Sequence, residues 1–328
     1  MNINIYDFML FPVANIGENF VSLFWEECYN DVGNFTLELV ATDKLRKTIT
    51  RDMYVERSDR KNVMVIKTVQ DTGAMLVLSG KQATRVLDDV PFLATIKMGQ
   101  NIETTIYDEY EKINFPATHF VKNGLSLKAD FQTSNKSFLE VITKYGKLSE
   151  FGFLAYRDKN KILFELHQPE NSSVIFSEFL GNLKIDKVTF SSANYKREAI
   201  VLGQGVGDER IMTRVYWDGN HAFDGEPLRR VIVDARDLRL EEGGDEELYI
   251  EELKARGYEK LLEQPNIIQV ECTPTAEGFG DKFDIGSRAR ILIPEKGLRL
   301  DTRIVKFQEK RQKNNIEQKI MFGDLIEG

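Results

Sequence analysis

Apolar and polar residues alternate along the first part of the chain, up to about residue 77. The alternation is regular at residues 35–39, and the apolar segments 63–69 and 75–78 flank an Asp-Thr-Gly sequence at 71–73. A period of two is typical of strands, and a short turn between two such segments predicts a hairpin. We therefore expect a strand at the N-terminus and a small antiparallel barrel or sandwich after it.

From about residue 79, helical spacing replaces the alternation. A short helix is expected at 81–88. A longer one is predicted at 101–113, where apolar residues recur every three or four positions: Ile102, Ile106, Tyr110 and Ile113.

A further helix is predicted over residues 138–145, with Ser134 or Asn135 as its N-cap and Gly146 as its stop. The apolar segments on either side of an Asp-Lys-Asn turn at 158–160 predict a hairpin. Helices followed by a hairpin indicate a compact α+β unit.

Strand patterns return after residue 170, in two groups separated by a helix. The groups lie at 188–190, 199–202, 211–216 and 230–233, and at 267–271, 289–293, 302–308 and 317–322. The helix is expected to begin after Asp245 as its cap, to place Tyr249, Leu253 and Leu261 on one stripe, and to end before Pro265.

These patterns predict an α+β protein that is mainly β, with two antiparallel β-barrel-like domains and smaller α+β insert domains. The first barrel-like domain is expected at residues 1–78, an α+β domain at 79–170, and the second barrel-like domain at 171–328. A helical insertion at about 240–266 interrupts the last domain. A chain of 328 residues has room for two or three such units.

The composition, 42% hydrophobic and 29% charged residues, is that of an ordinary globular protein. No apolar segment approaches the ~20 residues that a membrane span requires. The first residues lack the basic start and the cleavage site of a secretory signal. Cys28 and Cys272 have no metal or redox spacing, so we expect two buried thiols and folding in a reducing cytoplasm.

The formal net charge of −8 argues against a protein that grips nucleic acid. Stable binding to phosphates requires clustered basic residues, and this chain has only short basic pairs such as Arg229-Arg230. An acidic balance is compatible with a conduit through which DNA passes without binding.

Three glycines in five residues, at 203–207, suggest a phosphate-binding loop, but the details exclude one. Asp208 stands where the dinucleotide fingerprint has glycine, no Lys-Ser or Lys-Thr follows, and the next element is a strand. We interpret these glycines as a bend or bulge in a strand.

The remaining polar residues form no convincing catalytic or metal-binding set. His119, His167 and His221 are isolated from one another and from the cysteines. Asp218 and Asp224, near a Trp217 that could stack on a sugar, are the best candidates for a glycosidase pair, but acids in such a loop are more often turn formers. We expect no catalytic residues, metal or cofactor.

Residues 201–240 resemble a segment of the tail and baseplate hub proteins of siphophages and prophages. The shared features are the glycine-rich strand, a Trp-Asp loop and the Val-Asp-Ala-Arg-Asp-Leu sequence at 233–238. The Trp25…Gly33-x-Phe35-x-Leu37 pattern and the Phe-Asp-Ile-Gly sequence at 283–286 are similar to other parts of that family. The resemblance therefore follows the chain in order over nearly its whole length.

This resemblance implies a non-enzymatic hub like that of contractile-phage baseplates. It implies a homotrimeric ring at the distal end of the tail tube, an attachment platform and a DNA conduit. Its partners would be the tail tube, distal tail proteins and the tape measure protein, in a virion tail assembled in the bacterial host cytoplasm. The strand–loop–strand units at 49–69 and 292–307 are the candidate docking elements.

A cell-wall glycan-binding or glycan-hydrolysing module is the alternative from another class of protein. It would show exposed aromatic residues in a cleft and two carboxylates ~5–10 Å apart.

Overall fold

The computed structural model describes residues 1–113, 115, 117–129, 132–133, 136–168, 174–216, 229–240, 243–264, 267–274, 283–312 and 315–326. Its largest feature is a 13-stranded sheet, whose main path runs β14-β18-β21-β20-β3-β4-β7-β6-β5-β1-β2. Strand β19 joins this sheet by pairing with β20, and β13 pairs with β19. Among the described strands the path ends at β14 and at β2, so the sheet is open and does not close into a barrel.

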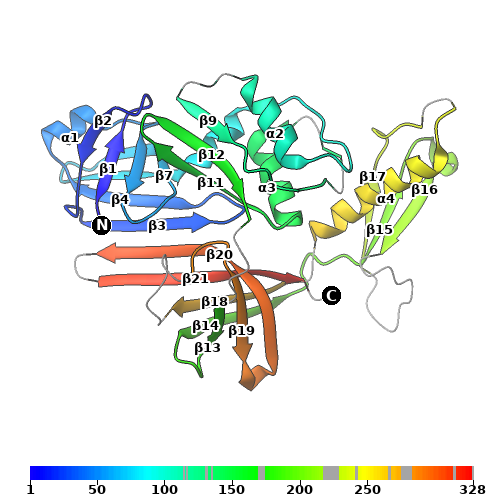
Figure 1. Cartoon of the computed structure of the whole chain (residues 1–328). Coiled ribbons are helices and arrows are strands. Elements are labelled where there is room, and N and C mark those ends of the chain that lie inside the picture. The colour runs from blue at the N-terminus through cyan, green and yellow to red at the C-terminus, as the bar shows by residue number, and fades with distance from the viewer. Residues whose placement is uncertain are drawn as a thin grey trace.

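The N-terminal half of this sheet, which we call the first β unit, is formed by strands β1–β7 (Figure 1). The predicted hairpin at 63–78 is confirmed. The elements are β1 Ile3–Tyr6, β2 Pro12–Asn15, β3 Ser22–Cys28, β4 Asn34–Val40, α1 Asp43–Thr48, β5 Tyr54–Arg57, β6 Met64–Asp71 and β7 Met75–Gln82. The strands alternate buried and accessible positions, and the inward residues, among them Trp25, Leu37 and Leu78, form one hydrophobic cluster.

The C-terminal half of the sheet, the second β unit, has its own hydrophobic cluster around Phe176, Ile291 and Phe322. Its elements are β13 Val174–Ser177, β14 Leu183–Ser191, β18 Ile267–Pro274, β19 Arg288–Ile293, η3 Pro294–Lys296, β20 Leu298–Gln312 and β21 Asn315–Ile326. Strands β20 and β21 are longer than their sequence patterns predict, because their outer ends pair with each other and with β3.

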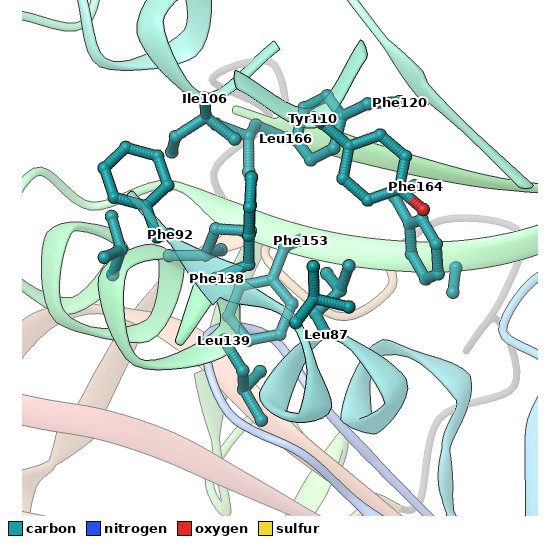
Figure 2. Packing of buried hydrophobic residues seen from close by; sticks show 14 of the residues in the cluster. Leu87, Phe92, Ile106, Tyr110, Phe120, Phe138, Leu139, Phe153, Phe164 and Leu166 are labelled. Atoms are coloured by element: carbon teal, nitrogen blue, oxygen red, sulfur yellow. The ribbon is translucent and has the colours of Figure 1, made fainter. Parts of the chain in front are cut away.

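A larger α+β unit packs on the first β unit. It contains η1 Ala83–Asp89, β8 Pro91–Phe92, α2 Ile102–Glu111, β9 Thr118–Val121, β10 Lys136–Ser137, α3 Phe138–Leu148, β11 Gly152–Asp158 and β12 Lys161–His167. Figure 2 shows aromatic rings from several of these elements meeting in one core, with Tyr110 next to Phe120, Phe138 and Phe164. Val63 and Val65 of the first β unit belong to the same hydrophobic cluster, so the two units share buried surface.

The stop and the cap predicted for α3 were wrong. Its N-cap is Ser137, whose Oγ accepts from the Glu140 amide at 3.1 Å, while Glu140 Oε2 accepts from the Ser137 amide at 2.9 Å. Ser134 and Asn135 lie outside the described residues. Gly146 does not end the helix, because here a glycine serves close packing: a Cβ atom would lie 3.0 Å from the Phe151 carbonyl oxygen.

A smaller α+β unit projects from the second β unit at the right of Figure 1. It contains β15 Glu198–Leu202, η2 Gly207–Glu209, β16 Met212–Tyr216, β17 Arg230–Asp234 and α4 Glu246–Leu262. As predicted, Asp245 caps α4 and Tyr249, Leu253 and Leu261 are buried along one face. Pro265, the expected stop, lies outside the described residues.

Candidate functional site

The two β units meet edge to edge through strands β3 and β20. The strands are antiparallel, and seven residue pairs are in register, from Lys306 opposite Cys28 to Gln312 opposite Ser22. Main-chain hydrogen bonds therefore continue from one unit into the other, and neither strand is left as an open edge. We call this region the junction.

A buried carboxylate, Glu27, is the centre of the junction. Its oxygens accept hydrogen bonds from Trp25 Nε1 at 2.8 Å, from Arg60 Nε at 2.7 Å and from Asn62 Nδ2 at 2.8 Å. Arg60 also donates to Asp284 of the second β unit at 2.8 Å, and its guanidinium lies 5.0 Å from the centre of the Phe307 ring. Arg60 thus binds one carboxylate of each unit.

A second buried pair crosses the junction beside the first. Arg57 Nη2 lies 2.8 Å from Oε1 of Glu309 on β20, and both side chains are almost fully buried. Arg57 also donates to Asp59 at 2.8 Å and lies over the Trp25 ring, while Glu309 accepts from Gln318 at 2.8 Å. A buried ion pair is stable only when the remaining polar atoms of both side chains are also hydrogen-bonded. Most of those atoms of Arg57 and Glu309 are.

Burial by itself raises the pKa of Glu27, but the charge and hydrogen bonds of Arg60, with those of Asn62 and Trp25, outweigh it and hold the pKa below its usual value. For Glu309 burial is likewise opposed, by Arg311, Arg57 and Gln318, and its pKa is also lowered. Both groups are therefore carboxylates at neutral pH. The contacts of Glu27 and Glu309 with Arg60 and Arg57 are therefore electrostatic contacts shielded from water.

The Asp-Ala-Arg-Asp sequence of the smaller α+β unit has a structural role. Hydrogen bonds from Arg236 and Arg210 lower the pKa of Asp234, and Asp237 pairs with Arg256 of α4 at 2.9 Å. These contacts tie the end of β17 to the turn after β15 and to the helix.

The glycine-rich segment lies in the turn that follows β15, and not in a bend or bulge within a strand as expected. Gly205 and Gly207 have φ angles of +115° and +59°, in the left-handed region that favours glycine. Gly203 allows α4 to approach, because a Cβ atom there would lie 2.5 Å from the Tyr249 hydroxyl oxygen. That hydroxyl accepts from the Gln204 amide at 2.8 Å.

Two of the three histidines lie in the described part of the chain, and each has its own neighbour. His119 Nε2 is 2.6 Å from Lys161 Nζ. The His167 ring packs edge-on against Tyr29 at 5.3 Å, and burial lowers its pKa to about 4. His221 lies outside the described residues.

The two cysteines, Cys28 and Cys272, are buried free thiols, as predicted. Burial raises the pKa of each to about 12, which leaves almost no thiolate at neutral pH.

No group of three metal-ligating side chains occurs in the part of the chain that the structure describes. Trp217, Asp218 and Asp224, the candidates for a sugar site, lie outside the described residues. None of the described helices has the length and apolarity that crossing a bilayer requires.

The sequence matches one protein-family model over residues 2–324, and that family is described as Siphovirus ReqiPepy6 Gp37-like protein. Because the match covers nearly the whole chain, the protein belongs to this family. No curated protein matches the sequence.

The fold is that of solved prophage tail proteins. The structure is similar to prophage tail protein gp18 from Listeria monocytogenes EGD-e, with a TM-score of 0.58, 11% identity and coverage of 100% of this chain and 96% of that one. It is also similar to the 43 kDa tail protein of prophage MuSo2 from Shewanella oneidensis, with a TM-score of 0.59, 12% identity and 98% coverage of both chains. The tail protein of Neisseria meningitidis MC58 gives a TM-score of 0.58 at 11% identity, covering 99% of this chain and 96% of that one.

Proposed function

We propose that this chain is the structural hub of a phage or prophage tail, a homotrimeric ring at the distal end of the tail tube without catalytic activity. The observation that carries the proposal is the junction, where β3 and β20 join two β units into one sheet and buried ion pairs bind them together. Family membership and the similarity to prophage tail proteins support it.

The joined β units supply a physical reason for a trimer. Three copies present six β units, which is the number needed to meet a sixfold tube ring subunit by subunit. Such a match works only if both units of a copy keep a fixed orientation, and a buried, hydrogen-bonded junction provides one.

As folding units we propose the segments 1–78, 79–170 and 171–328, the last with its helical insertion at about 240–266. The separate hydrophobic clusters of the two β units support the division between the first and the last segment, and the cluster of the smaller α+β unit lies within the last one. Val63 and Val65 of the first segment also belong to the hydrophobic cluster of the α+β domain, so these two units share buried surface.

The charge of the chain suits a conduit for DNA. Three copies carry 3 × −8 = −24 formal charges, so acidic residues along a central channel would repel the phosphates of passing DNA. Basic residues lining the channel would contradict this part of the proposal.

Of the two candidate docking elements, the hairpin of β19 and β20 is the better one. Its tip, η3 with Gly297, is exposed and free to meet the tube ring or a distal tail protein. The end of β5 and the loop after it, within the 49–69 unit, are instead occupied at the junction, because Arg57 and Arg60 pair there with Glu309 and Asp284. We therefore propose the hairpin tip alone as the docking element toward the tube, the distal tail proteins and the tape measure protein.

Electron microscopy of intact particles carrying a gold-labelled affinity tag on this chain tests the proposal. We expect three labels per particle at the distal end of the tube. Particles without the label, or with the label at the capsid end, would contradict it. A dye-release assay on peptidoglycan with the purified chain separates the hub from the glycan-hydrolysing alternative, which alone predicts release that depends on Asp224.

A further inference from the structure

The two β units repeat one topology. Apart from β2, the strands of the first unit lie in the order β3-β4-β7-β6-β5-β1, and those of the second in the order β14-β18-β21-β20-β19-β13. The strands of each unit also follow one another along the chain in the same sequence, so β3 corresponds to β14, β6 to β20 and β7 to β21. The units differ at one end, where β1 is antiparallel to β5 and β13 is parallel to β19.

The strands β6 and β20 carry the same irregularity. The register with the next strand shifts between Ile66 and Thr68 in β6, and between Ile304 and Lys306 in β20. Each strand therefore has one extra residue, a β-bulge, at the same place in its unit.

The backbone beside the two bulges also agrees. Asp52 and Gly286 have φ angles of +63° and +87°, and their amides donate to the carbonyl oxygens of Ile66 and Ile304, each at 2.7 Å. A positive φ is uncommon outside glycine, so its recurrence at this point supports a residue-by-residue correspondence of the two units. Ile66 thus corresponds to Ile304.

The segments after the two bulges, Thr68–Asp71 and Lys306–Glu309, therefore correspond as well, but only the second is paired on both sides. In β20 this segment lies between β21 and β3, at the junction. In β6 it pairs with β7, while β5 on the other side reaches only Met64 and Val65. None of the described strands pairs with the second side of Thr68–Asp71, so this segment is an open edge.

The counterpart of β3 is an open edge too. β3 pairs with β4 on one side and β20 on the other, whereas β14 pairs with β18 alone among the described strands. In-register pairs show which residues correspond, through the series Ile66–Gly80–Phe35–Trp25 in the first unit and Ile304–Phe322–Val270–Val188 in the second. Val188 of β14 therefore takes the place of Trp25 of β3.

An exposed aromatic side chain, Phe190, lies on the open edge of β14, where it is 58% exposed. Two positions after Val188, it takes the place of Glu27, which is opposite Phe307 in the junction. The counterpart of Phe307 is Val69, a side chain that packs against the core of the first β unit. A large apolar residue on an open strand edge is typical of a surface that a partner covers.

We propose that β14 of one copy pairs with β6 of the next copy, so that the contact between copies repeats the junction within each copy. The register of the junction assigns four opposed pairs: Val188–Asp71, Thr189–Gln70, Phe190–Val69 and Ser191–Thr68. Main-chain hydrogen bonds form the contact, and Phe190 meets Val69 on one face of the sheet, as opposed residues of antiparallel strands do.

The pairing cannot form within one copy, because β18, β21, β20, β3, β4 and β7 lie between β14 and β6 in the open sheet. The contact is head-to-tail, and such contacts close into a ring when the rotation between copies allows it. Junction and contact are then the same step, so three copies complete six equivalent steps. The inference rests on the proposed trimer and identifies the contact that joins its copies.

Disulfide cross-linking in assembled tails tests the register. Gln70→Cys with Thr189→Cys places two cysteines opposite each other across the contact, within the reach of a disulfide. After mild oxidation we expect a covalent trimer of the chain on a non-reducing denaturing gel, because each copy links to both neighbours. Lys184→Cys with Gln70→Cys is the matched control and gives monomers, since Lys184 is exposed on the same strand roughly 17 Å from Thr189.

A positive control comes from the junction itself. Phe24→Cys with Lys310→Cys joins two opposed positions within one copy, so its disulfide forms without a change in mass of the band. It shows that the oxidation is complete between paired strands.

Substitution of Phe190 tests the contact without new cysteines. Phe190→Asp places a charge opposite an apolar side chain at the edge, which opposes strand pairing. We expect the concentration of chain required to assemble tails to rise at least about tenfold, whereas Phe190→Leu keeps an apolar contact and assembles like the wild type. Phe179→Asp, at a side chain 91% exposed between β13 and β14, is the matched control and leaves assembly unchanged.

The outcomes separate this inference from the proposed function. A ring of this chain without the Gln70–Thr189 link, while the junction pair is oxidised, overturns the contact and leaves the hub intact. A ring that forms equally well with Phe190→Asp does the same. Wild-type particles that contain no ring of this chain overturn the hub and the contact together.

Discussion

Arg60 and Asp284 are 224 positions apart in the sequence, yet Nη2 of the arginine and Oδ1 of the aspartate lie 2.8 Å apart. The same guanidinium holds the buried carboxylate of Glu27. One side chain of the first β unit therefore binds an acid within its own unit and an acid in the other. The Arg60 and Glu27 side chains are 7% and 2% exposed, so their contact is shielded from competing water and salt, whereas Asp284 is 47% exposed.

We predict that Glu27→Ala lowers the free energy of unfolding by about 3–5 kcal/mol, since it leaves Arg60 and Asn62 buried without their acceptor. Urea unfolding followed by tryptophan fluorescence measures the loss, because Trp25 donates to the same carboxylate. Asp284→Asn is the comparison. Its side chain is 47% exposed, so we expect a loss of no more than about 1 kcal/mol.

The double variant Glu27→Ala with Arg60→Ala tests whether the loss belongs to the pair. Residues in one ion-pair network are not additive, so the double variant should lose less than the sum of the two single variants. An additive result would mean that the two side chains stabilise the fold independently.

The elements of the fold follow from local patterns, while the junction does not. Alternation located β4, β6 and β7, and the stripe of Tyr249 and Leu253 located α4, because these signals depend on neighbours along the chain. The pairing of β3 with β20 depends on residues almost 300 positions apart, and no local pattern encodes it.

The charged residues of the junction were also missed. One signal was present in the sequence, since Glu26 and Glu27 directly follow the apolar residues 23–25 of a strand, where a buried charge requires a partner. Nothing in the sequence identified Arg60 as that partner. The Ser-x-x-Glu sequence at 137–140 is a different case, because a capping box is encoded by residues that are neighbours along the chain.

The stability of the protein should fall as the pH is lowered from 6.5 toward 4, and His167 is the reason. Burial lowers the pKa of this histidine to about 4, whereas an unfolded histidine has a pKa of about 6.5. Between these values the unfolded chain binds the proton and the folded one does not, so protonation favours unfolding by up to about 3 kcal/mol. Urea unfolding at several pH values measures the slope.

His167→Gln should flatten this slope between pH 6.5 and 4, and His119→Gln, at an exposed position, should retain it. Below about pH 4.5 a further loss is expected in all three proteins. Glu27 and Glu309 have lowered pKa values, so their stabilisation is present above the pKa of an unfolded glutamate and is lost as the pH falls through the folded one. If His167→Gln leaves the wild-type slope unchanged, the pH dependence of stability between pH 6.5 and 4 arises from groups other than His167.

Gly257→Ala should destabilise the smaller α+β unit, although alanine is the better helix former by about 1 kcal/mol. A Cβ atom at this position would lie 2.7 Å from methyl groups of both Val201 and Val215, so α4 would be forced away from the sheet. We expect a net loss of about 1–2 kcal/mol. Amide hydrogen exchange should show faster exchange in β15 and β16 and no change in the first β unit. Glu251→Ala, at an exposed position of the same helix, is the control, and equal exchange in both variants would contradict the packing argument.

Cys28 can report on whether the junction opens without global unfolding. It lies on β3 opposite Lys306 of β20, whereas Cys272 lies on β18 inside the second β unit. Burial raises the pKa of both thiols to about 12, so neither should react with an aromatic disulfide reagent at pH 8 unless the surrounding structure opens. If the junction is as rigid as the units that it joins, the two thiols react at the same slow rate, set by global unfolding.

Arg60→Ala should change this equality. The loss of Arg60 leaves Glu27 as an uncompensated buried charge at the junction, and separation of β3 from β20 then relieves it. We expect the reaction of Cys28 to accelerate by at least about tenfold relative to that of Cys272 in the same molecule, because local opening exposes only the first thiol. Cys272 is thus an internal control for global stability. Equal acceleration of both thiols would mean that Arg60 stabilises the whole fold, and that the orientation of the two β units is held by the strand pairing alone.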